Sequence, residues 1–130
     1  MKITRFEDID AWQEARILTK EIYKLTELPE FRKDWGLSQQ IQRASVSIMN
    51  NIAEGFDSGS RAEFIKFLGY ARRSASEVQC DLYVGLDRQY ITQNVFDDTY
   101  RQAEKSRRMI TAFMKYLRTL TRQPVNPLTR

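Results

Sequence analysis

Few residues of this sequence could take part in catalysis. The absence of histidine excludes Ser-His and Cys-His catalytic pairs, His-metal sites and the Glu-x-x-His motifs of di-iron bundles. The one cysteine, Cys80, has no metal-ligand companions nearby, and the adjacent Asp97 and Asp98 are typical of a helix start rather than of an acid–base pair. We predict no enzymatic activity, no cofactor, no metal and no small-molecule substrate. An enzyme that uses only lysine and carboxylates stays open.

The residues best suited to binding are basic and lie near the C-terminus. They recur mostly every seven residues, which places them on one side of a helix, and we call them the basic stripe: Arg101, Lys105, Arg108, Lys115 and Arg122. Such a stripe could follow a phosphate backbone, as in RNA or DNA. The alternative is a solvated helix face that suits the negative end of a helix dipole.

The composition limits the class of protein. With 130 residues, of which 42% are hydrophobic, the chain fits one folded domain. Residues 1–60 hold eight basic and ten acidic residues, whereas residues 61–130 hold thirteen and seven, so the positive charge lies in the second half. No apolar run is long enough to span a membrane, there is no signal-peptide core, and a single cysteine cannot form an internal disulfide. We expect a cytoplasmic protein.

Apolar residues recur with helical spacing in four segments, at about residues 8–26, 37–54, 61–88 and 92–122. The four stripes are Ala11, Ala15, Leu18, Ile22 and Leu25; Leu37, Ile41, Ala44, Ile48 and Ile52; Phe64, Leu68, Ala71, Ala75, Val78, Leu82 and Leu86; and Phe96, Ala103, Ile110 and Leu117. No segment alternates in the manner of a strand. Short connections between such helices predict an all-α, antiparallel up-down-up-down four-helix bundle over residues 1–122, followed by a flexible tail over residues 123–130.

Local signals fix the expected helix ends. Pro29 closes the first helix, and Gly55 stands where a left-handed residue often ends a helix. Ser60 and Glu63 form a possible capping box, and Thr92 is a plausible N-cap of the last helix.

The second predicted helix is unusually poor in charge. Between Leu37 and Gly55 its only charged residues are Arg43 and Glu54. We call the side opposite its apolar stripe the charge-poor face, which comprises Gln39, Gln42, Val46, Met49, Asn50 and Ala53. A helix so poor in charge is usually covered on both sides, which predicts a protein interface, most simply with another copy of the chain. The alternative is an exposed helix rich in neutral polar residues.

Glu54 lies in the last turn of this predicted helix, where a helix dipole disfavours negative charge. We expect a cationic partner for it, with Arg72, Arg73 and Arg107 as candidates.

Several short motifs, in order, resemble the 23S rRNA-intervening-sequence proteins. The match begins with Phe6-Glu7-Asp8-Ile9 and Trp12-Gln13 and continues through residues 36–44. The most characteristic string follows: Asn51, Ile52, Ala53, Glu54 and Gly55. Phe64, Phe67-Leu68, Ala71-Arg72, Ser74 and Glu77 extend the resemblance, which covers about residues 6–120.

The resemblance implies a four-helix bundle that assembles into a ring, commonly a homopentamer, without enzymatic activity. It also implies a relation to accessory subunits of diversity-generating reverse transcriptases, where a basic surface is thought to contact nucleic acid. This sequence departs from the family at Asp57-Ser58-Gly59, where a more basic turn is common, and at Arg73, where glycine is common. We expect a homo-oligomer that binds nucleic acid, RNA above all, through the basic stripe, or alternatively a protein-interaction scaffold or accessory subunit without that contact.

Overall fold

All four predicted apolar stripes lie on the inner sides of helices in the computed structural model, which describes residues 2–120. The long helices are α1 (Asp10–Thr26), α3 (Trp35–Asp57), α4 (Arg61–Asp87) and α5 (Gln93–Leu120). Every residue of the four stripes is buried except Leu86, which is half-buried. The periodicity of the sequence therefore gave both the number of long helices and the side that each one buries. Arg122 and the predicted tail lie outside the described residues.

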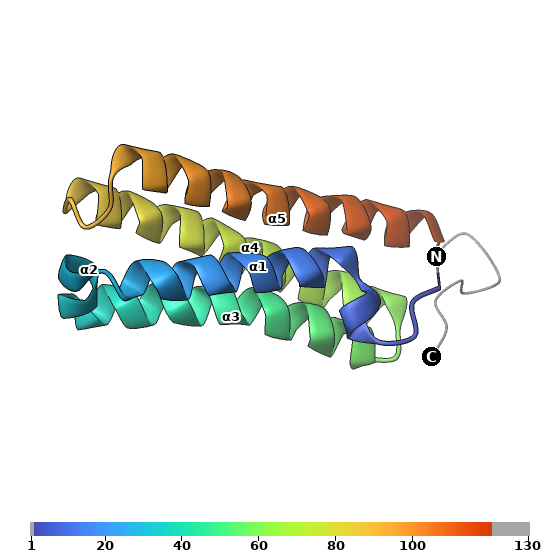
Figure 1. Ribbon diagram of the computed structural model, residues 1–130. Helices are drawn as coiled ribbons and strands as arrows, with labels where there is room; N and C mark the ends of the chain where they lie inside the picture. Colours follow the sequence, from blue (N-terminus) through green and yellow to red (C-terminus); the bar gives the residue numbers. More distant parts are fainter. Residues whose placement is uncertain (1, 121–130) are drawn as a thin grey trace.

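The long helices form one bundle in which each runs opposite to the one before it, as Figure 1 shows. Helix α3 packs against α1 and α4, and α5 packs against α4 and α1, so the four helices enclose a single core. The predicted all-α bundle is confirmed, and the described residues contain no strand. No helix among those residues has the length and hydrophobicity needed to cross a membrane.

The predicted N-caps Ser60 and Thr92 are confirmed, although only the Ser60 half of the capping box is present, and the predicted helix end at Gly55 is wrong. The Ser60 hydroxyl accepts a hydrogen bond from the Glu63 amide at 3.1 Å, and the Thr92 hydroxyl accepts one from the Val95 amide at 3.2 Å. Gly55, however, does not end its helix, because α3 continues to Asp57. The glycine with a left-handed backbone is Gly59, with φ +87°, in the turn that follows.

Gly55 is required for close packing instead. It is buried, and a Cβ atom there would lie 2.8 Å from Phe64 Cδ1 and 2.9 Å from Phe67 Cβ. Distances this short do not occur between real side chains, so the missing side chain lets α4 approach the end of α3.

Two short elements were not predicted from the sequence. A 3₁₀ turn, η1 (Phe6–Asp8), precedes α1, and a five-residue helix, α2 (Pro29–Lys33), connects α1 to α3. Pro29 takes the first position of α2, where a proline needs no amide hydrogen, so it starts a helix as well as closing the one before. The Phe31 side chain of α2 is fully buried and packs against the Tyr90 ring at 5.5 Å between centroids.

Candidate interface and nucleic-acid-binding surfaces

The charge-poor face lies on the outer side of α3, opposite the buried stripe. Asn50 is exposed, and the other five residues of the face are half-buried. Gln42 is held toward α1, because its side-chain amide donates to the Thr26 hydroxyl at 2.8 Å. The structure thus brings the predicted interface residues together on one continuous side of a helix.

A groove of about 510 Å³ runs along this face. Four residues of the charge-poor face line it, together with Tyr23 of α1 and with Arg43 and Glu54 of α3. The Tyr23 ring is 44% exposed. An open groove that combines amides, an exposed ring and one charge of each sign suits a protein surface better than a small molecule.

Trp35 extends the same face by one turn and was missed from the sequence. Its side chain is 71% exposed, although tryptophan is usually among the more buried residues. The helix predicted from the apolar stripe begins at Leu37, which places Trp35 in the preceding connection. In the structure α3 begins at Trp35, and the helical spacing places it in line with Gln42, Val46 and Ala53. An exposed indole beside a charge-poor helix face is typical of interface anchors.

Two sequence expectations for α3 change with the structure. Met49 packs against the hydrophobic core, so it belongs partly to the interior and only partly to the charge-poor face. Glu54 is exposed and has no ion pair among the described residues. Of its three candidate partners, Arg107 pairs with Glu104 at 2.8 Å and the Arg73 guanidinium lies over the Tyr70 ring at 5.8 Å. Both contacts join residues three positions apart on one helix, so they engage these arginines locally and away from Glu54.

The characteristic string from Asn51 to Gly55 contributes both to core packing and to contacts between helices. Ile52 is fully buried, and Gly55 lies in close contact with α4. Asn51 donates to the Ser47 hydroxyl at 3.0 Å, and that hydroxyl accepts from Ser74 of α4 at 2.9 Å. This part of α3 is therefore joined to α4 by a neutral hydrogen bond between two serines.

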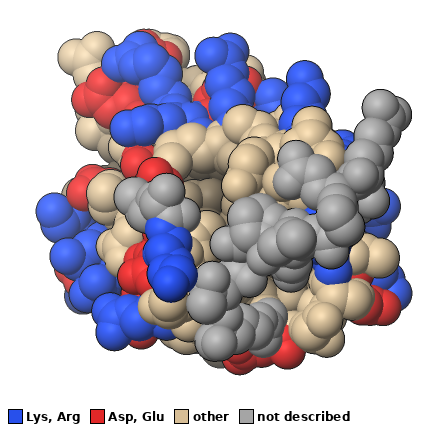
Figure 2. Space-filling model, turned by 90° about the vertical axis from the view of Figure 1, so that its right-hand side faces the viewer, with Lys and Arg blue, Asp and Glu red and all other residues tan. Residues whose placement is uncertain are grey.

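The basic stripe lies on the solvent side of α5. The four described members, Arg101, Lys105, Arg108 and Lys115, are all exposed. Figure 2 shows Lys and Arg side chains along the upper edge of the molecule, with acidic side chains among them.

Acidic residues pair with three members of the stripe. Arg101 contacts Asp98 at 2.6 Å, Arg108 contacts Glu104 at 3.0 Å, and Lys105 reaches Glu14 of α1 at 3.5 Å. Lys115 has no acidic partner among the described residues. The Arg101–Asp98 pair is exposed on both sides and contributes about 0–1 kcal/mol, so it is a weak competitor of a phosphate. In the other two pairs the acidic side chain is largely buried, with Glu14 11% and Glu104 24% exposed.

Glu104 also binds Arg107, a basic residue of α5 that does not belong to the basic stripe. Its carboxylate accepts two bonds from Arg107, at 2.9 and 2.8 Å, and one from Gln79 of α4 at 3.0 Å. These hydrogen bonds from Arg107 and Gln79, with a smaller one from Arg108, lower the pKa of Glu104 to about 2. Glu104 is therefore ionised at any physiological pH. The Arg107–Glu104 spacing of three residues was visible in the sequence, but the contribution of α4 was not.

The described residues contain no group of three His, Cys, Asp or Glu side chains that could hold a metal ion. Cys80 is exposed on α4.

Comparisons with known proteins agree with this architecture. Residues 7–112 match the model of a family described as 23S rRNA-intervening sequence protein. A solved structure of a protein of unknown function from the S23 ribosomal protein family of Bacteroides thetaiotaomicron superimposes with a TM-score of 0.75 and 25% sequence identity. The similarity covers 81% of this chain and 98% of that one. No curated protein sequence matches the chain.

Proposed function

Since the chain belongs to the 23S rRNA-intervening sequence protein family, we propose that it is a non-enzymatic, self-assembling helical bundle that binds RNA through the basic side of α5. The observation that carries the proposal is the charge of that helix. From Arg101 to Leu120 it contains six basic residues and one acidic residue, and the four described residues of the basic stripe face solvent. The matching family is named for an intervening sequence of 23S rRNA, and the solved relative, of unknown function, is assigned to a ribosomal protein family.

The expected contact is with phosphates rather than with bases. Guanidinium and ammonium groups form charge-assisted hydrogen bonds with phosphate oxygens, and few groups near the stripe could read base edges. Each phosphate contact releases a condensed counterion, so affinity falls with salt. For three contacts to a single strand the loss between 50 and 200 mM salt is roughly 20-fold.

Self-assembly is the second part of the proposal. The charge-poor face and the exposed Trp35 support it, because a second protein surface would cover both. A closed homo-oligomer repeats the basic stripe in every subunit, which multiplies the number of phosphates that one RNA can contact. Five copies is the number that the family resemblance suggests.

Fluorescence anisotropy with a labelled structured RNA at low salt tests the RNA contact. The variant R101E/R108E/K115E is expected to lose binding. A matched variant, R16E/K20E/K24E, makes the same change of charge on exposed residues of α1 and is expected to lose much less. Light scattering should give both variants the mass of the wild type.

A protein-interaction scaffold or accessory subunit is the second candidate, favoured by the ion pairs that already occupy Arg101, Arg108 and Lys105. Absence of RNA binding by the wild type at low salt, or equal binding by the triple α5 variant, would favour that function over ours.

A further inference from the structure

Asp81 of α4 is a buried carboxylate between two helices. The residue is only 4% exposed. Its Oδ1 atom accepts a hydrogen bond from the Gln40 side-chain amide of α3 at 2.7 Å. Its Oδ2 atom is inaccessible to solvent and has no hydrogen-bond partner among the described residues. A buried charged oxygen without a partner is costly, so this arrangement favours the neutral form of the carboxyl group.

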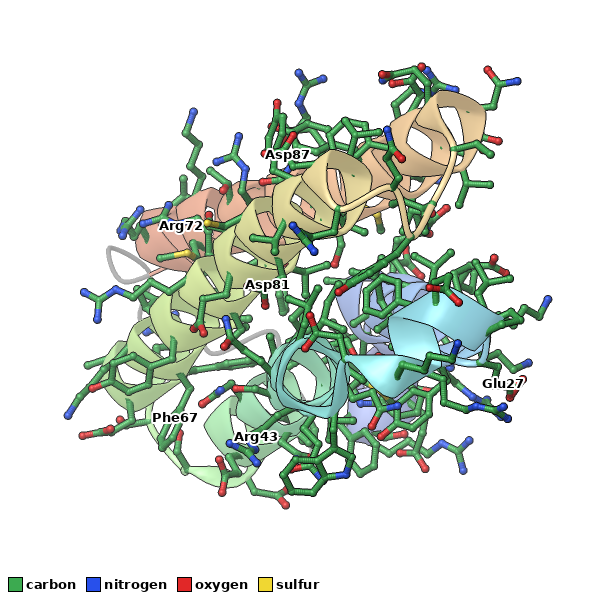
Figure 3. The ribbon with its side chains drawn as sticks, turned by 90° about the vertical axis from the view of Figure 1, so that its left-hand side faces the viewer. Glu27, Arg43, Phe67, Arg72, Asp81 and Asp87 are labelled. Atoms are coloured by element: carbon green, nitrogen blue, oxygen red, sulfur yellow. The ribbon has the colours of Figure 1, made fainter. Side chains whose placement is uncertain are left out.

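No cation compensates the charge. Glu77, one turn earlier on α4, adds a second negative charge on the same side of the helix. Arg43 lies in the groove that α3 and α4 form with Glu77, but Figure 3 shows it on the outer side of α3, away from Asp81, which lies between the two helices. At the start of α3, Asp34 is occupied by bonds from the Leu37 amide and the Tyr90 hydroxyl. No ion pair to Asp81 exists among the described residues.

The balance of these contacts determines where the carboxyl group titrates. Burial raises the pKa of Asp81 above its ordinary value of 3.8, the Gln40 hydrogen bond opposes this, and the Glu77 charge adds to the rise. The pKa therefore agrees with what the geometry indicates, which is a carboxyl group that binds its proton more tightly in the folded protein than in the unfolded chain.

We propose that the contact between α3 and α4 is pH-sensitive and is strongest when Asp81 carries a proton. The protonated carboxyl still accepts from Gln40 at Oδ1, and the unpartnered charge disappears. The Ser47–Ser74 bond on the same pair of helices is neutral and does not change with pH. Helix α3 also carries the charge-poor face. Proton uptake by Asp81 therefore strengthens the contact with α4 that holds this helix, and with it the face, in place.

The direction of the effect follows from linkage. Below pH 3.8 both the folded and the unfolded protein carry the proton, and the contact has its full strength. As pH rises from there through the raised pKa of the folded protein, the unfolded chain loses its proton first and stability falls. Above that pKa the loss is complete. Ordinary acid denaturation has the opposite sign.

Thermal unfolding of the full chain between pH 7.5 and 4.0 tests the proposal by comparing wild type with D81N. Asparagine keeps the shape and the oxygen that accepts from Gln40 but cannot ionise. We expect the Tm of D81N, taken relative to the wild type, to be highest at pH 7.5 and to fall by a few degrees toward pH 4.0. A difference in Tm that stays constant, or that grows as pH falls, would overturn the proposal.

D87N is the matched control. Asp87 lies near the end of the same helix, is exposed and is well separated from Asp81 in Figure 3. Its Tm difference from the wild type should vary less with pH than that of D81N, because Asp87 is exposed.

A direct measurement covers the case in which D81N does not fold. Carboxyl-carbon NMR of the wild type should show the Asp81 signal titrating clearly above pH 3.8. Titration at or below that value contradicts the proposal regardless of how the variants behave.

Discussion

The outer faces of α3 and α5 contain opposite kinds of side chain, although both helices bury apolar stripes of the same kind. Between Leu37 and Gly55, α3 has one basic and one acidic residue, whereas the last twenty residues of α5 have six basic residues. The α3 face is largely half-buried already in a single chain and ends at an exposed tryptophan, while the four described residues of the basic stripe are exposed.

This difference indicates which residues reflect what the protein contacts. Residues on the inner sides must pack in the core, so they are apolar in both helices. The outer residues are free of that constraint, so their chemistry reflects what meets them. Neutral amides, Val46 and Trp35 suit another protein surface, and a row of guanidinium and ammonium groups suits an anion.

The largest expected effect concerns the proposed interface on the outer face of α3. Val46 lines the groove and makes less contact with the core than Met49 does, so V46E tests the interface without disturbing the bundle. A buried, unpaired carboxylate costs several kcal/mol, so V46E should reduce the assembly to monomers at micromolar concentration. Light scattering measures the mass, and circular dichroism should show unchanged helix content.

The same change at Val84, which is 42% exposed on α4, is the control and should leave the mass unchanged. A V46E protein with the mass of the wild-type oligomer, or a wild type that is itself monomeric, would contradict the proposed interface.

A second effect concerns the inner side of α3, where the comparison predicts that packing governs. G55A should destabilise the fold by about 1–3 kcal/mol, because the added methyl group would meet Phe64 and the Cβ atom of Phe67. Urea unfolding measures the change.

G69A provides a matched control in the interior of α4, where the nearest atom to the added methyl is Met114 Cε at 3.8 Å. There the higher helix propensity of alanine should stabilise the protein by up to about 1 kcal/mol. Equal effects at the two glycines would contradict the packing explanation for Gly55.

A smaller effect concerns α5, where the stability contributed by the Glu104 contacts should depend on pH. Glu104 has a pKa of about 2 in the folded protein against an ordinary 4.5, so its contacts stabilise the fold above pH 4.5 and lose that contribution as pH falls toward 2. The Tm advantage of wild type over E104Q should therefore shrink on acidification. This is the reverse of the dependence expected for Asp81. An advantage independent of pH would show that the Glu104 hydrogen bonds do not depend on its charge.

The smallest effect is at the surface of α5. Arg101 and Asp98 form a short ion pair, but their side chains are 72% and 77% exposed. We expect R101A to change the free energy of unfolding by less than about 0.5 kcal/mol. Chemical unfolding that shows a loss above about 1 kcal/mol would indicate that the stripe has a structural role and is not reserved for a ligand.

The fold could be predicted from the sequence because helical periodicity records burial directly. Each apolar stripe identified its helix and its buried side, and the Ser60 and Thr92 caps act within three residues of chain. Gly55 was misread because the same residue type serves both for a left-handed turn and for close helix contact, and only the position of α4 distinguishes them.

The candidate surfaces could be predicted only in part. Spacing placed the basic stripe and the charge-poor face on single sides of their helices. Trp35 was missed because it precedes the first apolar residue of the predicted helix. The pairs Glu14–Lys105 and Gln79–Glu104 connect residues 91 and 25 positions apart, so they depend on how the helices pack, which a sequence pattern does not record.

Sedimentation velocity of wild type, V46E and R101E/R108E/K115E, each mixed with labelled RNA at low salt, tests most directly whether the two faces have separate roles. We predict that RNA sediments with the wild-type oligomer. RNA should still bind the V46E monomer, though more weakly, and the triple variant should remain oligomeric while its RNA sediments free. RNA that sediments free of the wild type, or a variant that loses assembly and binding together, would contradict the account.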